Sequence, residues 1–421
     1  MTEKPIILKT TEHNEPDIDN IDVDINEIVK QLKFDNEHPE KYLVRLNNSR
    51  LKASYYIGCK WLIENECAIV VEPKIENIDY LTMFLHCFNS PITSDILSKI
   101  YKIDFNAPAI KLPAKTFELT PFIIIHFLNL LKKIVKKGLK KDYVWVEENL
   151  SSKVKGKILI SKNIKHNFTK ARADRNYCKY QEYSYNCIEN KILKKALDFV
   201  SSYLKHNFSD NKELLNLLYF NKKIFDYIED YEVTINSFKL IKTNNLYKEY
   251  NEALKVAKMI FKRFDYSINR TIIEKEAEFP PFHIDMALLF EIYAFSLLHK
   301  TYGNDIQYQY HGKYGEIDFL NTTNKTIIDA KYKEKYSREE YEISDIRQLS
   351  GYSRDINVIK EVGIDIYNEV PIIDCLIVYP DQENGYETIE KENFISQNNK
   401  IKQFYKFYKY GIKLPVIKEI N

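Results

Sequence analysis

The stretch that most constrains this chain runs from Tyr314 to Lys333 and reads YGEIDFLNTTNKTIIDAKYK. It predicts a β-hairpin, because two runs of alternating apolar residues flank a turn of Asn and Thr residues. Side chains along a strand alternate between its two faces, so Asp329 and Lys331 point the same way. Pairing of the two strands brings Asp318, at the end of the first strand, beside them.

Two carboxylates and an ammonium on one face of a hairpin are costly unless they serve a purpose. A Mg²⁺-dependent phosphodiesterase uses such a set, because the cation prefers carboxylate oxygens and keeps waters that can attack phosphorus. An Asp-x-Lys triplet alone occurs by chance in many proteins of this size. The triplet therefore indicates a phosphodiesterase site only together with the elements around it.

The chain has 421 residues, enough for two or three domains with real cores. Its formal net charge of +2 excludes neither a nucleic-acid nor a protein partner. No basic-then-apolar signal pattern opens the chain, and the most apolar run, Pro121–Leu131, is too short to span a bilayer. We expect no membrane association and a cytoplasmic location. Scattered cysteines with no paired spacing predict free thiols and no zinc site: Cys59, Cys67, Cys87, Cys178, Cys187 and Cys375.

The pattern of elements predicts an α+β multidomain fold with three parts. Residues 1–150 form an N-terminal, β-rich docking domain, in which Tyr42–Ile75 reads as a small antiparallel sheet and Ile25–Leu32 as a short helix. A helix is expected from Thr120, with Gly138 just past its end. Residues 151–270 form a basic segment and a helical connector, with helices expected over 185–204, 212–228 and 247–264.

Pro280-Pro281 marks the boundary to the third domain, residues 271–421. It is expected to be a compact α/β domain that carries the candidate phosphodiesterase residues. Its elements are a helix at 286–300, a strand at 306–310, the hairpin, a helix at 342–354 and a buried strand at 372–379. The tail, 404–417, is too ambiguous to assign.

The basic segment has the composition of a phosphate-contacting surface. Between Lys153 and Lys179 nine basic residues stand against one acid, Asp174, with aromatic residues among them. A basic loop that faces an acidic protein, or only solvent, is an equal alternative. The candidate contacts to DNA or to a partner are Lys157, Lys170, Arg172, Arg175 and, further along the chain, Tyr352.

Two further features flank the hairpin. Glu291 lies in the middle of the apolar helix LLFEIYAF, where a carboxylate is costly unless it is paired or binds a metal. Alternatively, it lies at the edge of an amphipathic helix and faces water. After the hairpin, Gln348 and Tyr352 stand one helical turn apart on one face. Helix Glu, hairpin Asp, Asp-x-Lys and Gln-x-x-x-Tyr in this order are much less probable by chance than any one of them.

This order resembles the PD-(D/E)XK nuclease superfamily. The segments FHIDMALLFEIYAFSLL, GEIDFL, IIDAKYK, DIRQLSGY and CLIVYP together look like the McrC family, the nuclease subunits of McrBC-type modification-dependent restriction systems. The Pro of the superfamily name is Ile317 here, which makes Glu316 a competitor on the same face. We prefer Asp318 as the ligand because its Asp-Phe-Leu context fits better.

The resemblance implies roles for five residues. Asp318 and Asp329, with the carbonyl of Ala330, would hold Mg²⁺, and Glu291 would support the metal or its waters. Lys331 would position the attacking water and offset charge on the phosphate, and Gln348 would orient the site. The reaction implied is hydrolysis of DNA phosphodiesters.

The resemblance also implies a partner, a hexameric McrB-like AAA+ GTPase that recognises modified DNA and whose hydrolysis this subunit stimulates. The chain contains no G-x-x-x-x-G-K-[ST] phosphate loop, which agrees with a separate motor chain. Two alternatives remain: a nuclease-fold scaffold that activates a partner NTPase, and a stand-alone repair nuclease. The target modification, the residues that contact the GTPase and the stoichiometry are not determined by the sequence.

Overall fold

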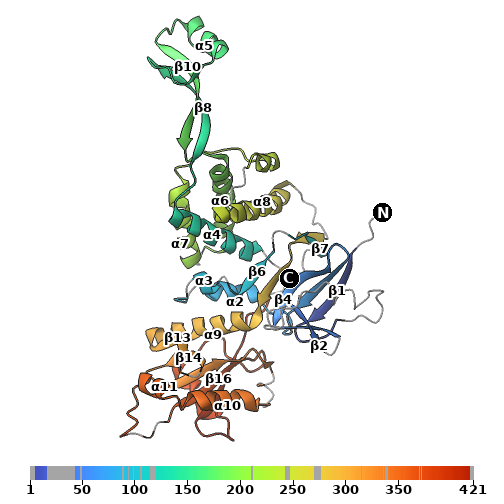
Figure 1. The fold of residues 1–421 in the computed structure, drawn as a ribbon. Coiled ribbons are helices and arrows are strands. Elements are labelled where there is room, and N and C mark those ends of the chain that lie inside the picture. The colour runs from blue at the N-terminus through green and yellow to red at the C-terminus, as the bar shows by residue number, and fades with distance from the viewer. Residues whose placement is uncertain are drawn as a thin grey trace. The chain divides into compact units, whose positions relative to one another are not determined.

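The computed structural model describes residues 5–16, 43–47, 50–87, 90–92, 94–97, 99–104, 107–113, 120–209, 212–241, 247–269, 276–313, 315–334, 336, 340–368, 370 and 372–417. The chain forms two compact units, one from residues 1–118 with 274–421 and one from residues 119–273. The fold is a mixed α+β arrangement with several sheets, as expected (Figure 1). No helix in the described ranges is both long and apolar enough to span a bilayer.

The first unit begins with a five-stranded sheet that joins distant parts of the chain. Its strand order is β1 (Ile6–Thr11), β5 (Cys67–Glu72), β4 (Tyr56–Ile63), β12 (Phe282–Asp285) and β6 (Tyr101–Ile103). β1 runs parallel to β5, and the other neighbours are antiparallel. Nearby are two small sheets and two helices: β2 (Val44–Asn47) with β3 (Arg50–Ala53), β7 (Ile110–Pro113) with β11 (Glu276–Phe279), α2 (Tyr80–Cys87) and α3 (Ser94–Leu97).

The second sheet of this unit carries the hairpin. Its order is β13 (Ile306–His311), β14 (Glu316–Asn321), β15 (Thr326–Ala330), β16 (Asp374–Pro380) and β17 (Phe407–Ile412). The first three strands are antiparallel and the last three parallel. The helices around it are α9 (Met286–Tyr302), α10 (Ile343–Tyr352), α11 (Ile356–Glu361) and α12 (Lys391–Phe394).

Apolar side chains on the two faces of this sheet pack against the surrounding helices. Ile327 packs with Val358 of α11, and Cys375, which pairs with Ile327, packs with Leu349 of α10. On β14, Phe319 stacks on Phe295 of α9, with ring centroids 5.8 Å apart. α9 is apolar on nearly all sides, so it is buried along most of its length.

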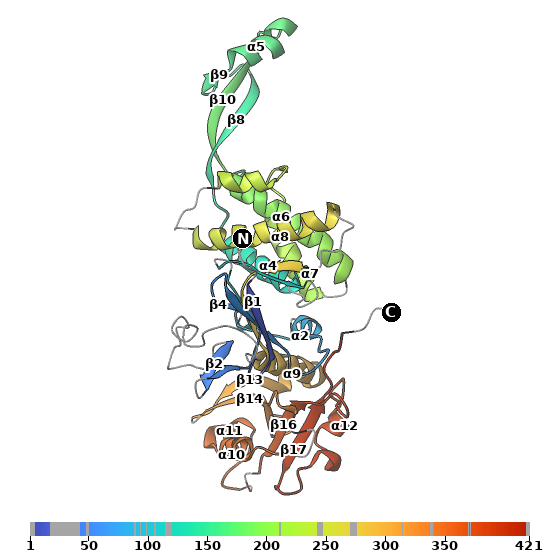
Figure 2. The same cartoon turned by 90° about the vertical axis from the view of Figure 1, so that its right-hand side faces the viewer.

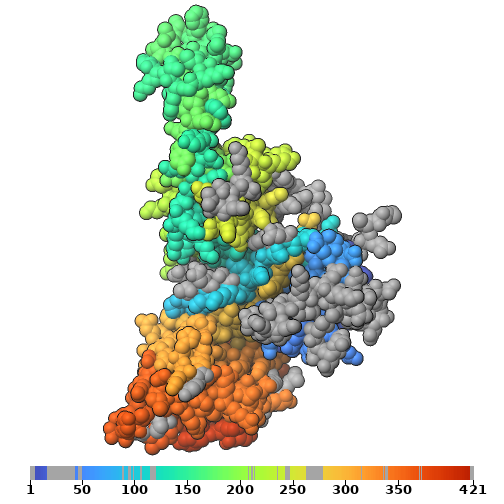
Figure 3. Space-filling model, viewed as in Figure 1, coloured from blue at the N-terminus to red at the C-terminus, as the bar shows by residue number. Residues whose placement is uncertain are grey.

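The second unit is a helical group with a projecting β-arm (Figure 2). The helices are α4 (Thr120–Lys137), α6 (Ile188–Asn207), α7 (Lys212–Phe225) and α8 (Lys248–Asn269). The arm is the antiparallel pair β8 (Asp142–Ser151) and β10 (Arg175–Ser184), and its tip holds β9 (Lys157–Ile158) and α5 (Ile160–His166). In the space-filling view the arm stands clear of the helices of its own unit (Figure 3).

A buried polar network joins the base of the arm to the helices. Lys140, just before β8, donates from Nζ to Glu189 of α6 at 2.7 Å, and its backbone N–H donates to the Tyr250 hydroxyl of α8 at 2.8 Å. Asn190 donates to the carbonyls of Lys140 and Tyr185, which flank the arm on its two sides. These bonds hold both strands of the arm where they leave the helices.

Most expected elements of the second sheet and the helices are confirmed, with small shifts at their ends. Two outcomes differ. The basic segment is part of the arm, neither of whose long strands, β8 and β10, was expected, and the unassigned tail supplies β17. The expected helix Ile25–Leu32 lies outside the described residues. The division into residues 1–150, 151–270 and 271–421 stays a prediction, while the described contacts put residues 1–118 and 274–421 in one unit. All six cysteines are buried free thiols, as expected.

Gly58 allows the close approach of β4 to β12. Its φ is +139°, and an added Cβ would lie 2.2 Å from the carbonyl oxygen of Phe282. Gly58→Ala is therefore expected to lower the free energy of unfolding, measured by urea denaturation, by about 1–3 kcal/mol. Gly138→Ala is the control, because Gly138 also has positive φ (+94°) but open space around it. Equal losses for the two variants would contradict the role of close approach.

Lys140 and Glu189 form a buried ion pair, with side-chain exposures of 8% and 5%. Lys140→Met leaves the Glu189 carboxylate buried without its cation, so we expect a loss of about 3–5 kcal/mol in the same urea measurement. Lys140→Met with Glu189→Leu removes both charges and should recover most of that loss. A double variant as unstable as the single one would show that the pair is not the source of the effect.

Candidate active site

The β14–β15 hairpin brings two carboxylates together. Phe319 pairs with Ile328, so Asp318 and Asp329, the next residue on each strand, lie side by side across the strands. Asp318 Oδ2 accepts a hydrogen bond from the backbone N–H of Ala330 at 2.8 Å. Asp329 is 3% exposed. Both predicted acids therefore meet where β15 ends.

Lys331 follows β15 directly and reaches both sides of the site. Its Nζ lies 2.7 Å from Asp329 Oδ2 and donates to Gln348 Oε1 at 3.3 Å. The Gln348 amide nitrogen donates in turn to the hydroxyl of Tyr352, one turn further along α10, at 3.1 Å. Asp329, Lys331, Gln348 and Tyr352 thus form one chain of contacts.

Glu291 of α9 faces this sheet rather than open water. Its Oε1 accepts hydrogen bonds from the Tyr308 hydroxyl at 3.0 Å and from the Gln309 amide at 3.4 Å. Gln309 has φ +51°, and the pairing of β13 with β14 is interrupted at this residue, between the pairs Tyr308–Phe319 and Tyr310–Ile317 and next to the site. Sequence reasoning missed Tyr308 and Gln309, and no local pattern marks them.

Burial and neighbouring carboxylates raise the pKa of all three carboxyl groups. Burial is the largest cause that raises the pKa of Glu291 to about 7, and nearby Glu316 and Asp329 add to it. Burial, then Asp329 and Glu291, raise the pKa of Asp318 well above its usual value. Burial also raises the pKa of Asp329, although Lys331 opposes this shift. The three acids therefore resist carrying their charges together.

Lys331 offsets part of this negative charge. Burial disfavours its ammonium, but Asp329 and Asp318 outweigh burial and raise the pKa of Lys331. The lysine is therefore charged at neutral pH. Glu316, the competitor for the ligand role, is exposed and lies 3.5 Å from His311 Nδ1. The geometry favours Asp318 over Glu316.

A second polar cluster, missed in the sequence, holds α10 beside the site. Lys333 Nζ lies 2.8 Å from Asp345 Oδ2 and 2.6 Å from Glu342 Oε2, and the Tyr336 hydroxyl also donates to Asp345. Asp345 is buried, at 5% exposure. These contacts tie the first turn of α10 to the segment after Lys331, so they help to place Gln348.

The donor set suits a hard cation. Among the described residues, no group of three or more His, Cys, Asp or Glu side chains is arranged to hold a metal ion. Magnesium does not require such a cage, because it is commonly bound by one or two carboxylates together with waters and substrate phosphates. The adjacent oxygens of Asp318 and Asp329 meet that smaller requirement.

The basic candidates Lys157, Lys170, Arg172 and Arg175 are exposed at the tip of the arm, in the second unit. The tip also exposes apolar side chains. Ile160 and Ile164, one turn apart on α5, are 71% and 50% exposed, and Phe168 is 81% exposed. Soluble proteins rarely leave such side chains grouped in water unless they bind a partner. The sequence predicted the charge and the aromatic residues of this segment, but the exposed isoleucines of α5 were missed.

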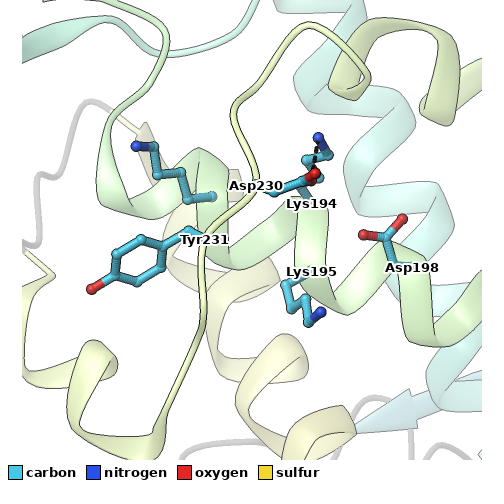
Figure 4. A pocket seen from close by; sticks show the side chains of 6 residues that line it. Lys194, Lys195, Asp198, Asp230 and Tyr231 are labelled. Carbon is cyan, nitrogen blue, oxygen red and sulfur yellow. Dashed lines mark ion pairs between the residues drawn. The ribbon is translucent and has the colours of Figure 1, made fainter.

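A small cavity beside α6 is lined by Lys191, Lys194, Lys195, Asp198, Asp230 and Tyr231 (Figure 4). Its volume is about 40 Å³, room for only a few waters. Lys194 Nζ lies 2.7 Å from Asp230 and Lys191 Nζ 3.0 Å from Glu229. These pairs fasten the segment after α7 to α6, and the cavity is too small for a nucleotide.

Comparison with known proteins identifies the family of this chain. The family model described as "McrBC 5-methylcytosine restriction system component" matches residues 51–367, about three quarters of the chain. No curated protein matches.

Two solved structures are similar at low identity. One is a refined half-complex from a tetradecameric assembly of Thermococcus gammatolerans McrB AAA+ hexamers with bound McrC: 16% identity, 96% of this chain and 94% of that chain covered, TM-score 0.37. The other is the cryo-EM structure of the Thermococcus gammatolerans McrBC complex: 17% identity, 69% and 87% covered, TM-score 0.30. On the extent of the family match, the chain belongs to the family of McrBC 5-methylcytosine restriction system components.

Proposed function

We propose that this chain is the DNA endonuclease subunit of a modification-dependent restriction complex, with a PD-(D/E)XK nuclease fold in its C-terminal part. The observation that carries the proposal is the meeting of Asp318, Asp329 and Lys331 at the end of β15, with Lys331 Nζ 2.7 Å from Asp329. Membership in a family of restriction-system components supports DNA as the substrate.

Asp318 and Asp329, with the carbonyl of Ala330, would hold Mg²⁺, and Glu291 would bind its waters. A bound Mg²⁺ supplies a hydrated cation that neutralises phosphate charge and acidifies a water. The chain's own residues do the rest. Lys331 holds the attacking water and offsets charge on the phosphate, Gln348 orients the Lys331 ammonium, and Tyr308 and Gln309 hold Glu291.

The partner in this proposal is an AAA+ GTPase like McrB, which would select modified DNA. The chain has no phosphate-binding loop of its own, so NTP hydrolysis requires another chain. The exposed apolar face of α5 supports the arm tip as the docking surface for that partner, because phosphates do not select apolar side chains. The basic residues around it would then contact acidic groups of the partner rather than DNA.

Lys331→Ala tests the nuclease assignment. The wild type should cut DNA that contains 5-methylcytosine only with Mg²⁺, the GTPase partner and GTP present. Lys331→Ala should lower the cleavage rate by about 100-fold or more, since it removes a charge aimed at the reacting phosphate, and should leave GTP hydrolysis stimulated. The assays are gel cleavage and phosphate release. Lys360→Ala, an exposed lysine on α11, is the control and should cut normally.

The other outcomes separate the alternatives. If the wild type and Lys331→Ala both stimulate GTP hydrolysis and neither cuts, the chain is an activator with a nuclease fold. If the wild type cuts equally well without the partner, a stand-alone nuclease is the better account.

Ile160→Ser with Ile164→Ser tests the docking surface. Both side chains are exposed, so the fold should be retained, while stimulation of the partner's GTPase and cleavage in the complex should fall at least about tenfold through lost apolar contact. Ile356→Ser, on the exposed side of α11, is the matched control. Normal stimulation with weaker DNA binding would instead assign the arm to DNA.

A further inference from the structure

Glu12 and Lys74, which follow two strands of the N-terminal sheet, contact the segment after Lys331. β1 and β5 run parallel and end together, with Thr11 paired to Glu72, so Glu12 and Lys74 leave the same edge of the sheet. The backbone N–H of Glu12 donates to the carbonyl of Glu72 at 3.1 Å, and the backbone N–H of Lys74 donates to Glu12 Oε2 at 3.1 Å. The ends of β1 and β5 are thus joined by hydrogen bonds.

Lys74 and Glu12 both contact Tyr332, the residue that follows Lys331. Lys74 Nζ donates to the backbone carbonyl of Tyr332 at 2.6 Å and lies 3.8 Å from the centroid of the Tyr332 ring. The Tyr332 hydroxyl lies 3.5 Å from Glu12 Oε2, and its ring packs against Phe290, the neighbour of Glu291, at 5.8 Å between centroids. One side chain of the N-terminal sheet therefore contacts both the backbone and the ring of Tyr332.

The backbone at Tyr332 has little other support from the sheet. The β15 ladder ends at Ala330, and the N–H of Lys331 still donates to the Val378 carbonyl at 2.8 Å. The chain then turns sharply, and the backbone N–H of Lys333 donates a hydrogen bond to the carbonyl of Lys331 at 2.7 Å. The charged ammonium of Lys74 makes a stronger hydrogen bond to the Tyr332 carbonyl than a neutral donor would, and this bond restrains the backbone at the turn.

Burying these charges is expensive, which argues against an incidental contact. Glu12 is 2% exposed, and burial raises its pKa to about 7, although Lys74 opposes that shift. Burial also lowers the pKa of Lys74. A pair of apolar residues would fill the same space at lower cost.

We propose that Lys74 is a positioning residue of the nuclease: by holding the Tyr332 carbonyl it sets the direction of Lys331, and so makes the geometry of cleavage depend on the N-terminal sheet. This inference rests on the proposed function. Lys331 is the residue whose placement matters most, because a shift of about 1 Å in a reacting group lowers the rate by up to about 100-fold.

The test is single-turnover cleavage of DNA that contains 5-methylcytosine, by the complex with its GTPase partner, GTP and Mg²⁺. Lys74→Met keeps the aliphatic stem and removes the ammonium. We expect the rate at saturating DNA to fall about 10- to 100-fold, with the DNA concentration at half-maximal rate and the stimulated GTP hydrolysis unchanged. Lys74→Arg should recover most of the rate, because arginine can donate to the same carbonyl.

Two further variants keep the test decisive. Glu12→Gln with Lys74→Met removes both buried charges, so it should fold as well as the wild type and still cut slowly. Lys9→Met, an exposed lysine on β1, should cut normally.

Wild-type cleavage by the double variant overturns the inference. So does a parallel loss of cleavage, GTPase stimulation and thermal stability in Lys74→Met, which is the result of a purely structural role. If the wild type itself does not cut in the full mixture, the proposed function fails, and the inference fails with it.

Discussion

The structure of the candidate site depends on the repulsion between two buried carboxylates on adjacent strands. Asp318 and Asp329 lie side by side because Phe319 pairs with Ile328, and Glu291 approaches from α9. Burial raises the pKa of each acid; Asp329 and Glu291 add to the shift at Asp318, and Asp329 adds to the shift at Glu291. Lys331 compensates for one negative charge, which leaves an excess that a divalent cation would balance.

The first unit connects this site to the N-terminal sheet in two places. β12 is the fourth strand of that sheet, and α9 starts at the next residue, with Asp285 capping it through the N–H of Leu288 at 2.9 Å. The second connection is the hydrogen bond from Lys74 to the backbone carbonyl of Tyr332. Movement of the N-terminal sheet would therefore reach both Glu291 and Lys331, the first through a helix and the second through one hydrogen bond.

The second unit is organised differently, around a buried polar network. Lys140, Glu189, Asn190 and Tyr250 hold the base of the arm, so the tip is carried by strands anchored at both ends. The tip exposes several of its apolar side chains, among them Ile160, Ile164 and Phe168. A firmly held base with an apolar, basic tip is the arrangement expected of a docking element.

The sequence by itself determined the local elements and the residue types of the candidate site. Alternation marked the hairpin, because side-chain direction in a strand follows from backbone geometry alone, and the helices α9 and α10 were expected close to their observed bounds. It also placed Asp329 and Lys331 on one face and predicted Gln348 and Tyr352 as neighbours.

Only the tertiary structure decided which distant segments meet. The interrupted pairing at Gln309, the hydrogen bond from the Tyr308 hydroxyl to Glu291, the entry of β12 into the N-terminal sheet and the contact of Lys74 with Tyr332 all join residues of different elements. No short pattern encodes such contacts, since they depend on strand pairing and register across the whole unit. The sequence specifies the parts of the site, whereas the packing of the sheets decides what holds them in place.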